Sequence, residues 1–395
     1  MTAQITSTGT TTTLQNNGNT YISVDTNDVV TMNQASLNGG QLGGRRNIVY
    51  NGEMKVAQRS ASTTGLGAAS GYFTLDRYRI GTNAASAGRF TMAQVADGPA
   101  GFANCLKLTV TTADTSIAAG ERLIITQRFE GQDLQQLQKG TATAKQVTVS
   151  FYVKGNANAL YVCELFDSDN LRSITQSFAV TTDWNRIELT FAADTSDPLN
   201  DDNGNSLEIN FWLHGGSTFT GGTFAVNTWN DYTEANRYAV ADRTSIFDAT
   251  SRTFFLTGIQ MEIGTVATDF ESRSYAEELT LCHRYYEKSY PSTHKAGTNL
   301  AHNQDAVHMQ SVATLEDGGS RMRMSKDFKV SKRAAPTVVY YDMVSAAGRV
   351  STISDDTFAN GVNPAVDGVV GTERFMMQMN GESPFLFHYT AEAEL

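Results

Sequence analysis

Short runs in which apolar and polar residues alternate fill the middle of the chain, and they limit its fold more than any other feature. An apolar residue stands at every second position in NCLKLTV at 104–110, VTVSFYV at 147–153 and RIELTFA at 186–192. A period of two is typical of a β-strand that buries one face. About eight such strands between residues 47 and 270, without a helical period, predict a two-sheet β-sandwich of jelly-roll type, with a barrel as the alternative.

The composition excludes several classes of protein. A formal net charge of -11 opposes binding to nucleic acid, and the Lys and Arg residues form no basic stripe along the sequence. Three cysteines are too few and too far apart for a disulfide framework. Because no stretch of about 18 apolar residues is present, we expect no membrane insertion.

Residues 1–46 differ from the rest of the chain. They are rich in Thr, Ser, Asn and Gly with few large apolar residues, so they cannot bury a core of their own. We expect an extended N-terminal β arm that stays disordered or pairs with strands of neighbouring copies, using the alternating run that contains Tyr21, Ile22 and Val24. The glycines of GGQLGGRR at 39–46 predict a hinge before the sandwich.

The alternating pattern stops near residue 271. In the segment that begins SYAEELTLCHRYY, Ser274 and Glu277 have the spacing of a capping box. We therefore predict one amphipathic helix of about four turns that links two domains within residues 271–291. Three residues at helical spacing suit either packing on a sheet or a seam between the identical helices of a homotrimer: Leu279, Cys282 and Tyr286.

After this helix the strand pattern returns. AVHMQSVATL, PTVVYYDMV and the final PFLFHYTAEAEL each combine β-branched or aromatic residues with alternation. Residues 292–395 are therefore predicted to form a second, smaller β-sandwich domain. The expected fold class is mainly β: an N-terminal arm at 1–46, a jelly-roll sandwich at 47–270, a linking helix at 271–291 and the second domain.

Several long motifs resemble one family of proteins. NIVYNGEMKVAQRS at 47–60 and YFTLDRYRI at 72–80 resemble the opening of a domain that is common in bacteriophage tail-fibre and virion fibre proteins. GIQMEIGTVATDFESRSYAEELTLCHRYYEKS at 258–289 is similar to the closing signature of the same proteins. KRAAPTVVYY at 332–341 and HYTAEAEL at 388–395 match their C-terminal module. The jelly rolls of this family also resemble carbohydrate-binding modules.

This resemblance implies a structural protein of the virion, assembled in the host cytoplasm and exposed on the particle surface. The leading hypothesis is a homotrimeric tail fibre subunit that attaches to other virion proteins through residues 1–46 and binds host-surface polysaccharide. An alternative in the same class is a capsid (head) fibre or a decoration protein. A third possibility is a tailspike depolymerase, but the sequence lacks the repeated rungs of a β-helix and a carboxylate pair in a recognisable context.

Glycan binding requires an exposed aromatic side chain with amides and carboxylates at its rim, and two places meet this requirement. The first is a strand, SLEINFWLHG, whose polar side carries a tryptophan, and the second is a loop, AVNTWNDYTEANRY. The alternative is that a loop or a neighbouring subunit covers this side of the sheet and that the aromatic residues are ordinary packing. The candidate glycan-binding residues are Glu208, Asn210, Trp212 and His214 on the strand, and Trp229 and Tyr232 in the loop.

The sequence gives little support for a catalytic site or a metal site. GxSxG, GxxxxGK[ST] and GxGxxG motifs are absent, and we expect neither an enzyme nor a cofactor. Asp197, Asp201 and Asp202 are the type of oxygen ligand that calcium prefers, but the order of ligands in an EF-hand is not present. A turn explains this cluster of acidic residues better than a calcium site does, because Asp and Asn favour turns for backbone reasons.

Overall fold

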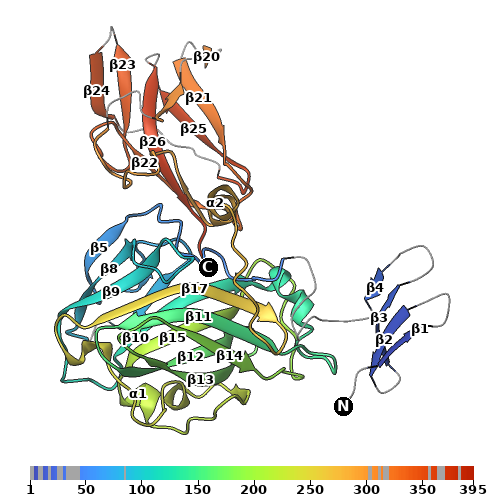
Figure 1. The fold of residues 1–395 in the computed structure, drawn as a ribbon. Coiled ribbons are helices and arrows are strands. Elements are labelled where there is room, and N and C mark those ends of the chain that lie inside the picture. Colours follow the sequence, from blue (N-terminus) through green and yellow to red (C-terminus); the bar gives the residue numbers. More distant parts are fainter. Residues whose placement is uncertain are drawn as a thin grey trace.

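The computed structural model describes most of the chain after residue 44. The described residues are 4–7, 12–16, 19–24, 30–32, 45–83, 86–300, 305–309, 313–314, 320–354, 357–362, 370–380 and 384–395. Strands make up most of their regular structure, and the prediction of a mainly β protein is confirmed (Figure 1).

The central body is a sandwich of two antiparallel sheets, as the alternating runs predicted. The wide sheet has the strand order β16-β13-β12-β15-β10-β7-β6, and the narrow sheet has the order β14-β11-β17-β9-β8-β5. The wide sheet consists of Asn230–Asp231 (β16), Arg172–Val180 (β13), Ala159–Asp167 (β12), Asn205–Gly215 (β15), Arg122–Glu130 (β10), Arg79–Thr82 (β7) and Gly71–Tyr72 (β6). The narrow sheet consists of Asn185–Phe191 (β14), Val147–Gly155 (β11), Thr253–Ile263 (β17), Cys105–Thr112 (β9), Arg89–Val95 (β8) and Ser62–Leu66 (β5).

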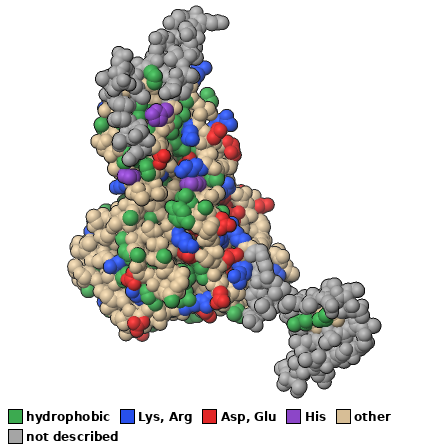
Figure 2. Space-filling view, turned by 45° about the horizontal axis from the view of Figure 1, so that its top comes forward, with side chains coloured by type: hydrophobic (Ala, Val, Ile, Leu, Met, Phe, Trp, Pro, Cys, Tyr) green, Lys and Arg blue, Asp and Glu red, His purple; other side chains and the backbone are tan. Residues whose placement is uncertain are grey.

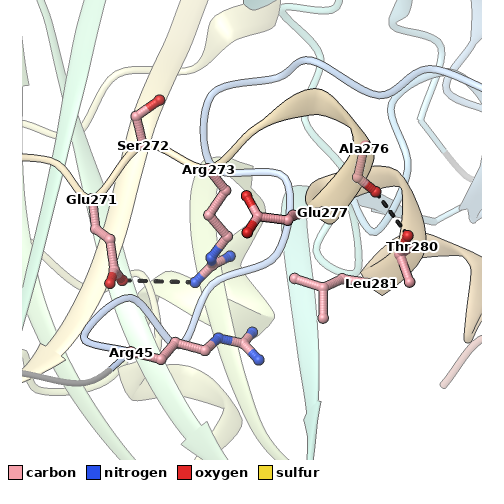
Figure 3. A pocket seen from close by; sticks show the side chains of 8 residues that line it. All are labelled: Arg45, Glu271, Ser272, Arg273, Ala276, Glu277, Thr280 and Leu281. Carbon is pink, nitrogen blue, oxygen red and sulfur yellow. Dashed lines mark hydrogen bonds and ion pairs between the residues drawn. The ribbon is translucent and has the colours of Figure 1, made fainter.

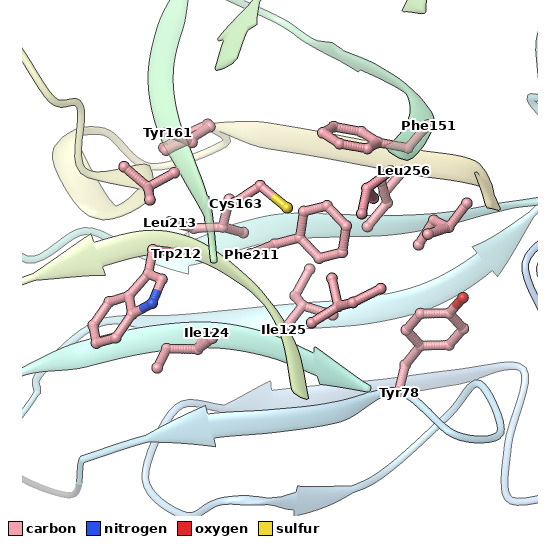
Figure 4. Packing of buried hydrophobic residues seen from close by; sticks show 14 of the residues in the cluster. Tyr78, Ile124, Ile125, Phe151, Tyr161, Cys163, Phe211, Trp212, Leu213 and Leu256 are labelled. Atoms are coloured by element: carbon pink, nitrogen blue, oxygen red, sulfur yellow. The ribbon is translucent and has the colours of Figure 1, made fainter. Parts of the chain in front are cut away.

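The core of the sandwich lies between these two sheets. Phe151 of the narrow sheet meets Phe178 and Phe211 of the wide sheet edge to face, with ring centroids 5.1 and 5.0 Å apart. These aromatic rings and their aliphatic neighbours are buried, and Figure 4 shows part of this packing. Such edge-to-face pairs add to the stabilisation from apolar burial. In the described part of the chain, four short 3-10 helices connect strands: Gly131–Asp133 (η1), Gln135–Leu137 (η2), Glu234–Asn236 (η3) and Ile246–Asp248 (η4).

The N-terminal region forms a small sheet of its own. The strands Gln4–Ser7 (β1), Thr12–Asn16 (β2), Asn19–Val24 (β3) and Val30–Met32 (β4) pair in sequence order. Tyr21, Ile22 and Val24 lie in β3, where Ile22 pairs with Leu14 and with Met32 of the same chain. These strands thus pair within their own chain, which the sequence did not predict, and their pairing with neighbouring copies stays a prediction.

The linking helix is shorter than the sequence predicted. Helix α2 spans Tyr275–His283, and the predicted capping box is confirmed, because Ser274 and Glu277 bond reciprocally. The chain then forms a strand at Tyr286–Lys288 (β18), so Tyr286 does not continue the face of the helix. A second helix, α1, has only four residues, Ser217–Thr220. None of the helices in the described part of the chain is long and apolar enough to span a membrane.

A second, smaller β-domain follows α2, as predicted, with its own buried aromatic core. Phe375 packs against Phe387 and Tyr389, with ring centroids 6.4 and 5.1 Å apart. One sheet is built around Phe385–Glu392 (β26) and contains β18, Val307–Met309 (β19), Thr337–Tyr341 (β22), Val350–Ser354 (β23) and Thr357–Val362 (β24). The other consists of Ala313–Thr314 (β20), Ser320–Asp327 (β21) and Arg374–Asn380 (β25).

The sequence motifs at 47–60 and 72–80 meet α2 and the chain end at the junction of the two domains. The guanidinium of Arg77 is fully buried, lies 3.4 Å from the ring centroid of Tyr285 and pairs with Glu394. Gln58 donates to the backbone oxygen of Tyr286 at 2.9 Å. Asn51 accepts a bond from the backbone N of Val56 at 2.9 Å, which shapes the turn that follows. These motif residues therefore build the junction between the domains.

Candidate functional site

The candidate site lies on the outer face of the wide sheet, the side that points away from the narrow sheet. Strand β15 passes through its centre. Leu207 and Phe211 of this strand are buried in the core, as the alternation predicted. Phe211 and Trp212 extend in opposite directions from the strand, which places Trp212 on the outer face (Figure 4).

Half of this outer face is covered. Residues 216–248, which connect β15 to β17, fold over it, and the Trp212 ring packs against Phe219 at 5.2 Å and against Tyr238 at 6.0 Å. The guanidinium of Arg237 lies 4.8 Å from the Trp212 ring centroid. Trp212 is 0% exposed, so the prediction that it offers a ring to a glycan was wrong, and the alternative of a covering loop is confirmed. We call this covered region the closed half.

A buried carboxylate organises the closed half. Glu164 of β12 accepts bonds from Nε and Nη2 of Arg237 at 2.8 and 2.6 Å, and from Nε1 of Trp212 at 2.9 Å. Asn210 donates to the same carboxylate at 3.1 Å. Asn210 is buried and bonded, so its prediction as a glycan ligand was also wrong. Sequence reasoning missed Glu164 and Arg237, although a carboxylate inside the apolar run YVCELF is a signal that a partner is needed.

His214 does not share the face of Trp212, because β15 has an irregular register at this point. Trp212 stands opposite Ile124, whereas His214 stands opposite Leu123, the neighbouring residue of β10. Since neighbouring residues of a strand face opposite sides, the two side chains diverge. His214 is buried between Ser245 and Glu121, with nitrogen to oxygen distances of 2.8 and 3.2 Å, and burial lowers its pKa. Its prediction as a glycan ligand was wrong for this reason.

The remaining outer face, which we call the open half, carries three half-buried arginines on β7 and β10. Nε of Arg128 pairs with Glu208 at 2.8 Å, and its Nη1 donates to the backbone oxygen of Leu395 at 2.7 Å. Glu208, a predicted ligand, lies at the border of the two halves but is buried, with 8% exposure, so the exposure that its prediction requires is not found. Arg79 and Arg122 form no hydrogen bond or ion pair with any residue that the structure describes. Burial lowers the pKa of Arg79, and the charge of Arg128 lowers it further.

An aromatic pair marks the border between the closed and open halves. The rings of Phe166 and Tyr232 lie 5.5 Å apart at an interplanar angle of 64°. The guanidinium of Arg237 lies 4.8 Å from the first ring centroid and 5.3 Å from the second. Both rings are partly exposed, so Tyr232 keeps the exposure that its prediction requires. Phe166 was missed by sequence reasoning, because its polar neighbours come from other strands.

Trp229 lies apart from Tyr232, although the sequence grouped them. Its indole Nε1 donates to the backbone oxygen of Ala192 at 2.8 Å, and the ammonium of Lys139 lies 5.4 Å from its ring centroid. Trp229 is half-buried and packs against the core of the sandwich. The two residues therefore do not form one platform, and the ring of Trp229 serves packing.

The remaining tryptophan, Trp184, was not among the predicted residues. It lies beside the outer side of the narrow sheet, where its ring packs against Phe255 at 6.1 Å and the ammonium of Lys154 lies 5.1 Å away. Among the described residues its buried indole N–H has no hydrogen-bond partner. A tryptophan beside Asp and Asn in the turn TTDWN was the signal that could have identified it.

The acidic segment that was weighed for calcium forms turns. Oδ1 of Asp202 accepts the backbone N–H of Gly204 at 2.8 Å, and Asp201 is exposed. Asp197 has a φ of 52°, and its backbone oxygen accepts a bond from the ammonium of Lys139 at 2.8 Å. Within the described ranges no three His, Cys, Asp or Glu residues are placed to hold a metal ion. Oxygen atoms that bind an ammonium or a backbone N–H are not arranged as a calcium site.

A groove of about 690 Å³ runs beside α2 (Figure 3). Charged side chains of both signs lie close together around the junction (Figure 2). Cys282 is 0% exposed and Tyr286 is 5% exposed within one chain. Because their own chain buries them, these two residues cannot form the predicted seam between the helices of a trimer. Leu279, the third residue of that prediction, is half-buried. The residues that line the groove are Arg45, Glu271, Ser272, Arg273, Ala276, Glu277, Thr280 and Leu281.

Comparison with known proteins gives only distant similarities. No protein-family model and no curated protein matches the chain. Similar solved structures include the family 11 carbohydrate-binding module of a Clostridium thermocellum cellulosomal cellulase, with 14% identity, 53% of this chain and 99% of that chain covered, and a TM-score of 0.26. A family 30 carbohydrate-binding module has 13% identity, 55% and 95% coverage, and a TM-score of 0.26.

A third similar structure is the enzymatically active domain of tailspike protein 4 from bacteriophage CBA120. It has 12% identity and a TM-score of 0.29, and the match covers 55% of this chain but 21% of that chain. The function of the chain therefore has to be argued from its own side chains.

Proposed function

We propose that the chain is a non-enzymatic subunit of a bacteriophage fibre that binds host-surface polysaccharide on the open half of the outer face. The observation that carries this proposal is the position of the partly exposed Phe166 and Tyr232 beside Glu208 and Arg128 on one sheet face. Aromatic rings offer the apolar C–H faces of a sugar a stacking surface, and the charged groups at the rim can bond its hydroxyl groups.

The sequence motifs support the phage part of the proposal, since they resemble those of virion fibre proteins over most of the chain. The fibre is a homotrimer that attaches to the virion through residues 1–46. Single glycan contacts with a Kd near 1 mM are worth about -4 kcal/mol, and linking several sites raises the apparent affinity by roughly 10² to 10⁴. A trimer with three open halves would bind a cell surface by this mechanism.

A binding role also agrees with the state of the acidic residues on this face. Glu164 is occupied by Arg237, and Glu208 is occupied by Arg128 and by Asn205, which donates to it at 2.9 Å. Carboxylates whose oxygen atoms already bind arginine and amide donors are poor candidates for general acids and bases, because these oxygen atoms are not free to exchange a proton with a substrate. Release of reducing ends from host polysaccharide by the purified protein would contradict the non-enzymatic part.

The test is binding of the full chain to host cells and to their isolated surface polysaccharide. Phe166→Ala and Tyr232→Ala should each weaken binding by about tenfold, which corresponds to about 1.4 kcal/mol. Tyr275→Ala is the matched control, because Tyr275 is 48% exposed on α2, away from the sheet face. Equal binding by all three variants would disprove this site. A monomer in analytical ultracentrifugation would disprove the trimer.

A further inference from the structure

Arg79 and Arg122 stand out among the cations of the sandwich. Arg79 is on β7, opposite Thr126 of β10, and Arg122 begins β10, so the two arginines come from adjacent strands. Both are half-buried on the open half. Neither forms a hydrogen bond or an ion pair with any residue in the ranges that the structure describes.

Several other buried or half-buried arginines in and around the sandwich have acidic partners, and Arg89 instead bonds the backbone oxygen atoms of Ser86 and Gly88. Arg237 binds Glu164 at 2.6 Å, Arg284 binds Glu130 at 2.6 Å, and Arg172 binds Asp194 at 3.0 Å. Removing a guanidinium from water without a partner is unfavourable, which is why partly buried arginines are normally paired. Two arginines without acidic partners on one face are therefore unusual in a chain with 41 acidic and 30 basic residues.

The surroundings of the two arginines carry charges of both signs: Arg128 and Arg122 lower the pKa of Arg79, and Glu208 raises it. Arg128, on the same strand as Arg122, repels Arg79, and its own bonds are made to Glu208 and to the backbone of Leu395. The Nε of Arg122 is buried without a hydrogen-bond partner in the described residues, while its guanidinium lies 5.6 Å from the Phe219 ring centroid. The contact with Phe219 positions the guanidinium of Arg122, and its N–H donors form no hydrogen bond with the described residues.

We propose that Arg79 and Arg122 bind the anionic groups of an acidic polysaccharide. This inference rests on the proposed function and specifies its ligand class: a glycan that carries uronate carboxylates, or sulfate or phosphate esters. A guanidinium presents several N–H donors in one plane, so it forms paired bonds with such oxygen atoms. The aromatic pair stacks on a sugar ring, and the arginines select the charge along the chain.

The experiment compares polymers that share a backbone and differ in charge. Polygalacturonate is paired with its neutral methyl ester, and dextran sulfate is paired with dextran, which distinguishes a carboxylate from a sulfate ester. The full-length chain is tested as wild type, Arg79→Gln, Arg122→Gln and Arg323→Gln. Arg323→Gln is the matched control, because it removes the same charge from an exposed arginine of the second domain that bonds Gln378.

We expect the wild type to bind at least one acidic polymer more tightly than its neutral form. Arg79→Gln and Arg122→Gln should each weaken that binding about tenfold, with the neutral polymer and the Arg323→Gln variant unaffected. Thermal unfolding of each variant confirms that it is folded. Equal losses in all three variants would overturn the inference, because they would show an effect of net charge alone.

Two further outcomes separate this inference from the proposed function. If the wild type binds neutral polymers and Tyr232→Ala abolishes that binding, the glycan-binding function stands and the preference for an acidic ligand is overturned. If Tyr232→Ala and Phe166→Ala leave binding to cells unchanged while Arg79→Gln reduces binding to polygalacturonate, the acidic ligand stands and the aromatic part of the proposed site is overturned.

Discussion

Arginine side chains have opposite environments in the closed half and in the open half of the same sheet face. In the closed half, Arg237 is buried and paired with Glu164, and it lies against Trp212. In the open half, Arg79 is half-buried and has no acidic partner among the described residues. The difference arises from residues 216–248, which cover one half only. A charged residue on a sheet face therefore stabilises the fold or remains available for a ligand according to what lies above it.

The largest effect should come from breaking the buried pair. Arg237→Ala leaves Glu164 as an unpaired buried carboxylate, and we expect a loss of about 3–5 kcal/mol in the free energy of unfolding. Urea denaturation measures it. Arg243→Ala is the control, since Arg243 is exposed in the same covering segment and bonds only a backbone oxygen at 3.2 Å. A loss below 1 kcal/mol for Arg237→Ala would contradict the described closed half.

A smaller effect should follow from removing the indole N–H beneath the cover. Trp212→Phe keeps an aromatic ring but deletes the 2.9 Å bond to Glu164, at a cost of about 1–3 kcal/mol in stability. Binding to host cells should not change, because the Trp212 ring is buried. Weaker cell binding by a stably folded Trp212→Phe would show that the cover opens and that the two halves form one site.

Acid should also weaken the sandwich, through the buried His214. Burial lowers its pKa in the folded protein, so the unfolded state binds more protons once the pH falls below about 6.5. Stability is therefore fully present above this pH and decreases as the pH falls toward the folded pKa, by at most about 1.4 kcal/mol per pH unit for one proton. Urea denaturation at pH 7 and pH 5 should show a smaller decrease for His214→Gln than for the wild type, and an equal decrease would contradict this role.

The smallest effect on stability should come from the open half. Arg79→Gln removes a charge that Arg128 repels and breaks no bond to a described residue, so stability should change by less than about 0.5 kcal/mol, toward greater stability. Denaturation beside Arg237→Ala measures the contrast directly. A loss of more than 2 kcal/mol for Arg79→Gln would show that this arginine has a structural partner.

The sequence predicted on which face of its strand a side chain lies better than it predicted whether that side chain is exposed. Alternation placed Phe211 in the core and Trp212 on the other side, because a period of two follows from strand geometry. Exposure of Trp212 depends on the path of residues 216–248, which no local pattern contains. The pairing of Arg237 with Glu164 joins positions 73 residues apart, so neither residue alone indicates its partner.

In helix α2, too, a contact between residues close in sequence was predicted and a contact with a distant strand was not. The capping box predicted its start correctly, since capping is a contact between residues three positions apart. Its end was predicted too late, because Tyr286 fits the helical spacing but pairs with Glu392 of β26 instead. The irregular register of β15 near His214 was likewise invisible in the sequence, because it exists only relative to β10.

The covering segment has a consequence for how such a protein can change. Residues 216–248 are continuous in sequence and contribute only β16, at the edge of the wide sheet, so changes of length outside β16 and Arg237 leave the pairing of the other strands intact. A segment without Phe219 and Tyr238 would uncover the Trp212 ring, which packs against both. Under the proposed function, exchange of parts of this one segment would change how much of the sheet face reaches a ligand, while the order of the other strands is kept.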